Sequence, residues 1–202
     1  DVEEPILILS HYWKPSNKVR VNTNFGYQTG KIGNSRFDYQ FADNPDPVYY
    51  KKLPSYWTTY FNGNVYAPNQ AAADGLKASF LAYGQVDWKD IYRINNENLA
   101  NDSRIVLYED RTDDTTITAN TNILAQLSDN IVMNGGINYI HSESENFKNL
   151  LDLLGGVTFN NDNTFGVGIS RYNDVNNPNQ KVYEGDKYGY HYNMVSTKFD
   201  AF

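Results

Sequence analysis

The sequence predicts an all-β protein with about five long antiparallel strands. The first observation is a stretch from Thr116 to Ser142, in which apolar and polar residues alternate on both sides of the turn pair Asp129-Asn130. The second observation is an equally regular alternation from Lys18 to Gly30. Successive side chains of a strand point to opposite faces, so each stretch predicts a strand with one apolar and one polar face.

The stretch from Thr116 to Ser142 predicts a hairpin with arms at 115–128 and 131–142. Asp and Asn tolerate the backbone conformations that a tight turn needs. The apolar face contains Ile117, Ile123, Ile131, Ile137 and Tyr139, and the polar face contains Asn120, Asn122, Asn134 and Asn138. Both arms are long for strands of a globular protein. The hairpin therefore belongs either to a large soluble sheet or to a sheet tall enough to cross a bilayer.

Three further strands are expected at 5–13, 18–30 and 187–200. The strand at 18–30 has a polar face without any residue that normally fills a soluble core, so this face is expected to meet water. Its opposite face is apolar and contains Val19, Val21, Phe25 and Tyr27. In the last strand, one face is expected to carry Tyr188, Tyr190, Tyr192 and Met194.

The two remaining connections, 31–114 and 143–186, are expected to be long loops that carry short helices. One helix is predicted over 69–83, and a second is predicted to begin after Asp87 as its N-cap. A third is predicted over 143–154, where Phe147, Leu150, Leu151 and Leu154 are spaced for one helix face. A small hairpin that turns at 161–163 is a further expectation.

The first long connection is dense in aromatic residues between Phe37 and Phe61. Candidate ligand contacts in this aromatic loop are Tyr39, Tyr49, Tyr50, Tyr56 and Trp57. Exposed aromatic rings stack on sugars or on peptide side chains with little loss of conformational entropy. The alternative is that the rings pack against each other and order the loop.

The composition excludes several classes of function. The net charge is -7, and no basic stripe is present to neutralise phosphates, so a nucleic-acid partner is not expected. Cysteine is absent, which excludes disulfides and thiol chemistry. Tyrosine is abundant, with 17 residues, as in glycan-binding β-proteins and in transmembrane barrels with aromatic girdles. The chain opens on Asp1-Val2-Glu3-Glu4, so we expect a mature chain or a piece of a longer one.

No residue pattern predicts catalysis, a cofactor or a metal. His11, His141 and His191 lie in different predicted strands, without the spacing of metal ligands. The Asn/Asp-rich segments 43–46 and 173–177 lack the spacing of an EF-hand, and Asx turns explain them more simply. Glu143 and Glu145 are interpreted as charges that stabilise a helix N-terminus. We therefore expect a protein that is not an enzyme.

Short and long connections alternate along the chain. The short turns are at 14–17 and 129–130, and the long connections are 31–114 and 143–186. Short turns at one end and long loops at the other are typical of outer-membrane β-barrels. When the short turns are placed at the lower end of the barrel, the aromatic residues of the strands lie at two heights. Two interfacial girdles of aromatic residues would show this arrangement.

Several longer runs resemble the TonB-dependent outer-membrane receptors of Bacteroidetes. The resemblance covers most of the chain and lies in NTNFGYQTGKIGNSRFDY (Asn22–Tyr39), ADNPDPVYYKKLPSY (Ala42–Tyr56), VDWKDIY (Val86–Tyr92), YEDRTDD (Tyr108–Asp114), DLLGG (Asp152–Gly156) and NPNQKVYEGDKYGYHYNM (Asn177–Met194). It implies a barrel of about 22 strands with a plug inside it. It also implies a parent protein that captures a substrate with its extracellular loops and imports it with energy from TonB.

The sequence is accordingly interpreted as a section of one receptor barrel, without its plug, in the outer membrane of a Gram-negative, Bacteroidetes-like cell. The expected partners are outer-membrane lipid, the plug domain of the same parent chain and, through the plug, TonB. A surface lipoprotein is a further candidate partner, and the substrate is a siderophore, a glycan or a peptide. Two alternatives are a secreted β-rich glycan-binding module and a small complete outer-membrane barrel. An open five-strand wall is not expected to fold alone, because it has two unpaired edges and a lipid-facing surface.

Overall fold

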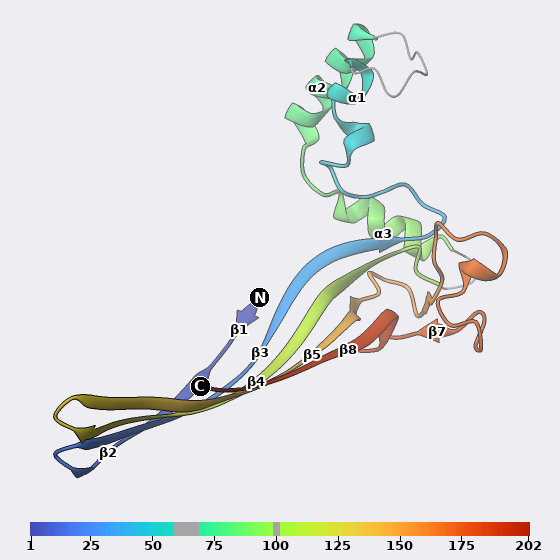
Figure 1. The fold of residues 1–202 in the computed structure, drawn as a ribbon. Helices are drawn as coiled ribbons and strands as arrows, with labels where there is room; N and C mark the ends of the chain where they lie inside the picture. Colours follow the sequence, from blue (N-terminus) through green and yellow to red (C-terminus); the bar gives the residue numbers. More distant parts are fainter. Residues whose placement is uncertain (59–68, 99–101) are drawn as a thin grey trace. The chain divides into compact units, whose positions relative to one another are not determined.

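The structure is a computed structural model that describes residues 1–58, 69–98 and 102–202. The chain forms two compact units (Figure 1). The sheet unit comprises 1–35, 109–149 and 187–202, and the loop unit comprises 36–108 and 150–186. Strands account for 54% of the structure and helices for 18%, so antiparallel β-sheet sets the fold class, as predicted.

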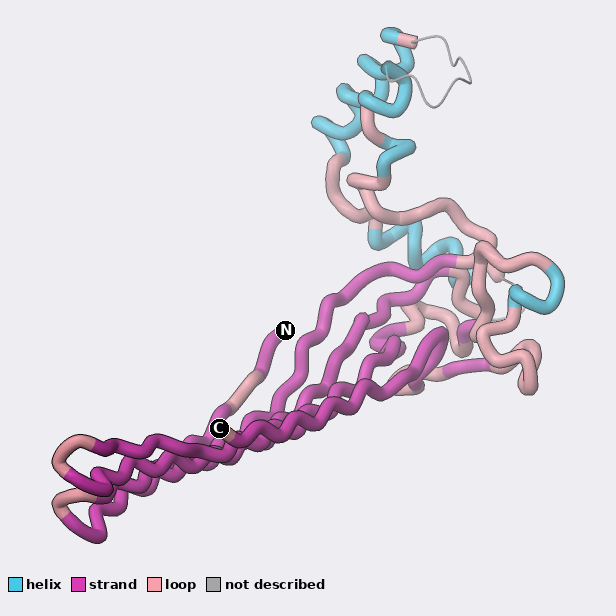
Figure 2. The backbone as a smooth tube through the Cα atoms, in the orientation of Figure 1, coloured by secondary structure: helices cyan, strands magenta, loops and turns pink. Residues whose placement is uncertain are grey.

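Six strands form one antiparallel sheet (Figure 2). They are β1 (Val2–Glu3), β2 (Ile6–Ser16), β3 (Val19–Tyr39), β4 (Ile105–Ser128), β5 (Ile131–Asp152) and β8 (Lys187–Ala201). The order is β1-β3-β4-β5-β8, and β2 also pairs with β3. The predicted hairpin is confirmed, since Asp129-Asn130 is the turn between β4 and β5. The turn between β2 and β3 is Asn17-Lys18, and both turns lie at the same end of the sheet (Figure 1).

Cross-strand contacts show which residues share a face. Leu9 pairs with Phe25 and Trp13 pairs with Val21 between β2 and β3. Between β3 and β4, the hydroxyls of Thr23 and Thr121 lie 3.2 Å apart on one face, and Asn24 Nδ2 donates to Asn120 Oδ1 at 3.0 Å on the other. Because side chains alternate along each strand, odd-numbered residues of β3, β4 and β5 share one face, and even-numbered residues share the other.

Three strands are much longer than predicted, and β2 runs to Ser16, so the turn predicted at 14–17 is shifted to 17–18. β3 continues past Gly30 to Tyr39, β4 begins at Ile105, and β5 continues past Ser142 to Asp152. The helix predicted over 143–154 is therefore wrong. A short apolar run fits the period of a helix as well as that of a strand. Here the segment forms a strand because β5 pairs with β8, from Ile137↔Ala201 to Asn149↔Lys187. The strict alternation in Ser142-Glu143-Ser144-Glu145 was the signal of a strand.

The first half of the loop unit contains the 3-10 helix η1 (Tyr50–Lys52) and the helices α1 (Ser55–Thr58), α2 (Gln70–Tyr83) and α3 (Trp88–Asn96). Two of these helices, α2 and α3, begin where the sequence predicts, whereas η1 and α1 were not predicted. The Asn69 side chain caps α2 by accepting from the Ala72 amide at 3.0 Å. The Asp87 side chain caps α3 by accepting from the Asp90 amide at 3.0 Å. Side-chain caps of this kind satisfy amides that have no partner inside the helix.

The second half of the loop unit has little regular structure. It contains β6 (Phe159–Asn160), η2 (Gly168–Arg171) and β7 (Lys181–Val182), and β6 pairs with β7. The hairpin expected to turn at 161–163 is wrong, because the partner of β6 lies about twenty residues further along the chain. The sequence suggested a partner directly after the turn because such a partner is close in the chain. In the structure β6 pairs with β7 instead, and this pairing buries Phe159 and Val182. None of the described helices has the length and apolar character needed to span a membrane.

The loop unit has a packed core around α3. Ile91, Ile105 and Leu154 are buried together, and Phe37 and Ile94 pack against them. Burial of each such side chain contributes about 1.5–3 kcal/mol. The loop unit is thus held together by the same hydrophobic packing that stabilises small soluble domains.

Candidate functional site

The nine residues predicted to face lipid lie on one face of the sheet unit. Six are exposed in spite of their apolar side chains; Phe25 is 40% exposed and Ile137 is 49% exposed. The other four are Tyr27, Ile123, Ile131 and Tyr139. The remaining three, Val19, Val21 and Ile117, are half-buried. No second layer of the described residues covers this face.

The apolar part of this face has a defined height. It runs from Val19 to Tyr27 in β3, from Ile117 to Leu127 in β4, and from Ile131 to Tyr139 in β5. Each segment is about nine to eleven residues long, which is the length of strand that crosses the hydrocarbon core of a bilayer at a tilt. We call this surface the apolar band.

The opposite face carries the predicted asparagines. Asn120, Asn122, Asn134 and Asn138 alternate with the residues of the apolar band. The hydrogen bond between Asn24 and Asn120 joins β3 to β4 on this face, and the hydroxyls of Thr116 and Ser142 lie 3.1 Å apart between β4 and β5. The separation of polar and apolar residues is incomplete, because Leu124 and Val132 are also exposed here.

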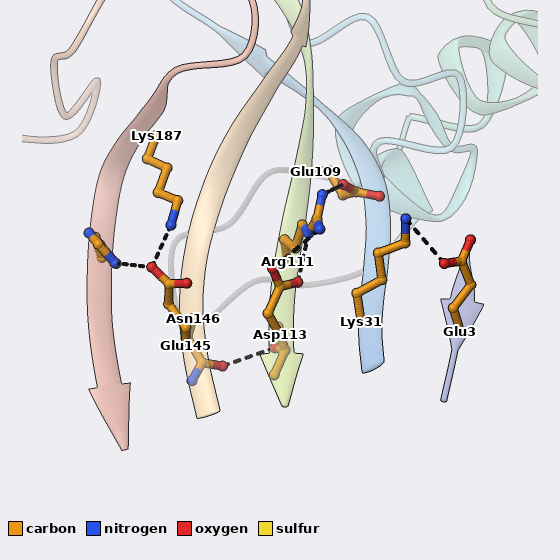
Figure 3. A network of polar contacts seen from close by, with 10 residues as sticks. Glu3, Lys31, Glu109, Arg111, Asp113, Glu145, Asn146 and Lys187 are labelled. Atoms are coloured by element: carbon orange, nitrogen blue, oxygen red, sulfur yellow. Dashed lines mark hydrogen bonds and ion pairs between the residues drawn. The ribbon is translucent and has the colours of Figure 1, made fainter. Parts of the chain in front are cut away.

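Beyond the apolar band, towards the long loops, the same odd-numbered face becomes charged (Figure 3). Lys31 Nζ lies 3.3 Å from Glu3 Oε2, between β3 and β1. In β4, Arg111 Nε lies 2.7 Å from Asp113 Oδ1 and Arg111 Nη1 lies 4.0 Å from Glu109 Oε2. Exposed ion pairs contribute little to stability. The apolar band therefore ends where these charged residues begin.

The charged region continues onto β5 and β8 (Figure 3). Glu145 Oε1 accepts from Lys187 Nζ and lies 2.6 Å from His191 Nε2. The hydrogen bond from Lys187, followed by the one from His191, lowers the pKa of Glu145 below its ordinary value. Glu145 lies outside the apolar band. Its predicted role at a helix N-terminus is wrong, because residue 145 lies inside β5.

Four of the predicted ligand contacts form a chain of rings in the loop unit. The ring centroids of Tyr49 and Tyr50 are 4.7 Å apart, those of Tyr50 and Tyr56 are 5.7 Å apart, and those of Tyr56 and Trp57 are 5.7 Å apart. Tyr39 packs against the core around Ile91. The rings thus order the loop by packing on one another, while Tyr50 remains exposed. Residues 59–61 of the aromatic loop lie outside the described residues.

The side chain of Asn95 is a structural centre that sequence analysis did not identify. It is 1% exposed. Its Nδ2 donates to the carbonyls of Ile105, Leu153 and Leu154 at 2.8–3.1 Å, and its Oδ1 accepts from the amides of Arg104 and Ile105 at 2.8 and 3.0 Å. One side chain therefore joins α3, the start of β4 and the turn after β5.

The run DLLGG supplies that turn. Leu154 and Gly155 have φ values of 50° and 98°, and the Leu154 amide donates to Asp152 Oδ1 at 2.7 Å. A Cβ atom on Gly156 would collide with the backbone of Ser103, so only glycine allows this approach. The glycine pair in the sequence was the signal of such a turn.

The described residues contain no group of three or more His, Asp or Glu residues arranged to hold a metal ion. The Asx turns predicted in the Asn/Asp-rich segments are confirmed. Asn44 Oδ1 accepts from the Asp46 amide at 2.8 Å, and Asp174 Oδ1 accepts from the Asn176 amide at 2.9 Å. His141 Nδ1 lies 2.8 Å from Thr197 Oγ1.

Comparison of the chain with protein-family models, with curated proteins and with solved structures finds no match. The function must therefore be argued from the two faces of the sheet and from the loop unit.

Proposed function

We propose that this chain is a section of the wall of an outer-membrane receptor of the TonB-dependent type, and that it is not an enzyme. In this proposal the apolar band faces lipid and the asparagine-rich face lines a water-filled lumen. The loop unit lies outside the cell and contributes to substrate capture. A plug domain of the parent chain, coupled to TonB, would drive import.

The observation that carries the proposal is the uncovered apolar band. Phe25, Ile123 and Ile137 are exposed on one face of the sheet, and Asn120, Asn122, Asn134 and Asn138 lie on the other. Large exposed apolar surfaces mark membrane or partner interfaces. The height of the band, about nine to eleven residues per strand, matches a bilayer. The change to charged residues beyond it matches the boundary with water.

The two alternatives receive less support. A soluble glycan-binding module would cover Val21, Phe25 and Tyr27 with a second layer, and no described residue does so. A small complete barrel would need its first and last strands to pair. Within the described residues, β8 pairs with β5 and has no partner in β1 or β2. The resemblance to TonB-dependent receptors supports a larger barrel, in which further strands continue the sheet.

The membrane orientation can be tested with single cysteines, because the chain has none of its own. Ile123→Cys and Ile137→Cys place a spin label on the apolar band, and Asn122→Cys and Asn138→Cys place it on the polar face. In lipid vesicles, we expect the first pair to be relaxed by oxygen and the second pair by a water-soluble nickel complex. Phe165→Cys in the loop unit is the matched control and should respond to nickel. Nickel access at all five sites would refute the proposal.

The receptor class has a separate test in the gene that encodes the chain. A plug-like domain upstream of the barrel section would support the TonB-dependent type. A complete gene that encodes further barrel strands but no plug would leave the membrane location standing and would refute the receptor class.

A further inference from the structure

A groove of about 520 Å³ lies in the sheet unit, directly beyond the apolar band. Thr29 and Thr115 line it, each two residues outside the band in β3 and β4, and Glu143 lines it from β5. These side chains lie on the odd-numbered face, which is also the face of the apolar band. A molecule whose apolar part covers the band would therefore place its polar end in the groove.

Two carboxylates give the groove open hydrogen-bond acceptors. Glu143 is exposed, and its carboxylate has no hydrogen bond or ion pair with any described residue. The Glu145 side chain is 32% exposed. Lys187 and His191 both contact its Oε1, and its Oε2 has no partner in the part of the chain that the structure describes. A carboxylate accepts several hydrogen bonds, so an occupant of the groove can donate to both residues.

The charges of the groove disfavour an anionic occupant. Lys31 is already paired with Glu3, and Arg111 is paired with Asp113 (Figure 3). Glu143 adds an unpaired negative charge, so a phosphate or another carboxylate would be repelled. Among the described residues no three acidic or histidine side chains are arranged to hold a bridging metal ion. The occupant therefore carries hydrogen-bond donors and no negative charge.

The spacing of the polar groups distinguishes a sugar from an ammonium group. Glu143 and Glu145 lie two residues apart on β5, which places their Cα atoms about 7 Å apart. Asn193 lies opposite Glu145 on β8, and Thr115 lines the groove from β4, so polar groups extend over three strands that are spaced about 4.8 Å apart. An ammonium group donates from a single point, whereas a sugar ring carries hydroxyl donors along its whole rim.

We propose that this groove binds the uncharged sugar headgroup of a glycolipid whose acyl chains lie on the apolar band. The sugar hydroxyls donate to the carboxylate of Glu143 and to Oε2 of Glu145. Hydrogen bonds to a carboxylate are stronger than hydrogen bonds between neutral groups. The sheet unit therefore prefers a glycolipid to other lipids that have the same acyl chains.

This inference rests on the proposed function, because it requires that lipid covers the apolar band. The two can nevertheless fail separately. If the spin labels on the band respond to oxygen but the chain has no preference for a glycolipid, only this inference is refuted. If the labels respond to the nickel complex on both faces, the proposed function is refuted and this inference with it.

The test is native mass spectrometry of the full chain in a polyoxyethylene detergent, which contains no sugar. Four lipids with identical acyl chains are titrated separately: monoglucosyl diacylglycerol, phosphatidylethanolamine, phosphatidylcholine and phosphatidylglycerol. Phosphatidylcholine measures the contribution of the acyl chains, because its headgroup has no N–H or O–H donor. We expect the glycolipid to bind about tenfold more tightly than phosphatidylcholine, which corresponds to one charge-assisted hydrogen bond. Phosphatidylglycerol, whose headgroup is anionic, should bind no more tightly than phosphatidylcholine.

Two substitutions of Glu143 test whether the carboxylate carries the preference. Glu143→Ala should reduce the preference for the glycolipid to about twofold or less, and Glu143→Gln, which retains an oxygen acceptor, should leave about threefold. Glu97→Ala is the matched control, since it removes an exposed carboxylate in the loop unit, and it should leave the preference unchanged. Amide hydrogen exchange verifies that each variant retains the sheet. If Glu143→Ala does not, Glu143→Gln and Glu97→Gln decide the question.

Four results would overturn the proposal. The first is equal binding of the glycolipid and phosphatidylcholine. The second is tighter binding of phosphatidylethanolamine than of the glycolipid, which would assign the groove to an ammonium group. The third is an equal preference in Glu143→Ala and Glu97→Ala, and the fourth is a preference that is present only after calcium chloride is added.

Discussion

The sheet unit and the loop unit contain the same kinds of residues, but they differ in how many apolar side chains they bury. In the sheet unit, the buried residues among those described are Gly33, Ala125, Phe147 and Tyr188, and its large apolar side chains are mostly uncovered. In the loop unit, Ile105, Leu150, Phe159 and Val182 are at most 1% exposed. The loop unit therefore contains its own core. The strands of the sheet unit are joined by backbone hydrogen bonds, and its apolar band is left exposed among the described residues.

The comparison predicts that the two units respond differently to the same kind of substitution. A change in a buried polar centre should unfold the loop unit, whatever the solvent. A change on the apolar band should matter only where lipid covers the band.

The largest effect is expected for Asn95→Leu. The substitution removes five hydrogen bonds and leaves the amides of Arg104 and Ile105 without their Asn95 acceptor. Each such group costs about 1–3 kcal/mol, so the loop unit should lose about 3 kcal/mol or more. Hydrogen exchange measured separately on the two units would show the loss confined to the loop unit. Asn96→Ala, at the exposed neighbouring position, is the control and should have little effect.

The second effect concerns the apolar band. Ile123→Arg should destabilise the chain in lipid vesicles by about 2–4 kcal/mol, because a cation near the middle of the bilayer is costly on the lipid face of a barrel. Asn122→Arg, one residue away on the polar face, should be tolerated. Folding yield in vesicles, measured by protease protection, compares the two. Equal yields would contradict the assignment of the faces.

A smaller effect is expected at the turn after β5. Gly155→Ala should destabilise the loop unit by about 1–2 kcal/mol, because φ is 98° and the added Cβ would lie 3.0 Å from Tyr92 Cδ1. Gly75→Ala in α2 should have the opposite sign and stabilise that helix by up to about 1 kcal/mol, since no atom lies within 4 Å of the new Cβ. Urea titrations of both variants test whether the free energy of unfolding falls for Gly155→Ala and rises for Gly75→Ala.

The smallest effect is a pH dependence of the pairing between β5 and β8. The pKa of Glu145 is lowered below 4.5 by its hydrogen bonds from Lys187 and His191. Its contribution to stability is therefore present above pH 4.5 and is lost as the pH falls through the lowered value. Amides of β8 near His191 should exchange faster in that acidic range. Glu145→Gln should remove this pH dependence, and an unchanged profile would show that the pair is not formed.

Short sequence patterns were sufficient to predict the elements that depend on contacts between residues close together in the chain. Strand alternation gave the hairpin around Asp129-Asn130, and the side chains of Asn69 and Asp87 gave the starts of α2 and α3. Each depends on contacts between residues a few positions apart. The division of the sheet into an apolar and an asparagine-rich face follows from the same alternation.

Distant pairing was not predictable in this way. The residues 143–152 carry both a helical and a strand pattern, and their pairing with β8, about forty-five residues away, decides for the strand. The buried centre at Asn95 depends on three segments that meet in space.

The chain thus fixes locally where its strands and helices begin and which side chains share a face, because those features depend on backbone geometry over a few residues. Tertiary contacts fix how far the strands extend, which apolar residues are covered, and where polar groups converge. The apolar band illustrates both. The sequence of β3, β4 and β5 determines its composition, but only the folded sheet shows that no described residue forms a second layer over it.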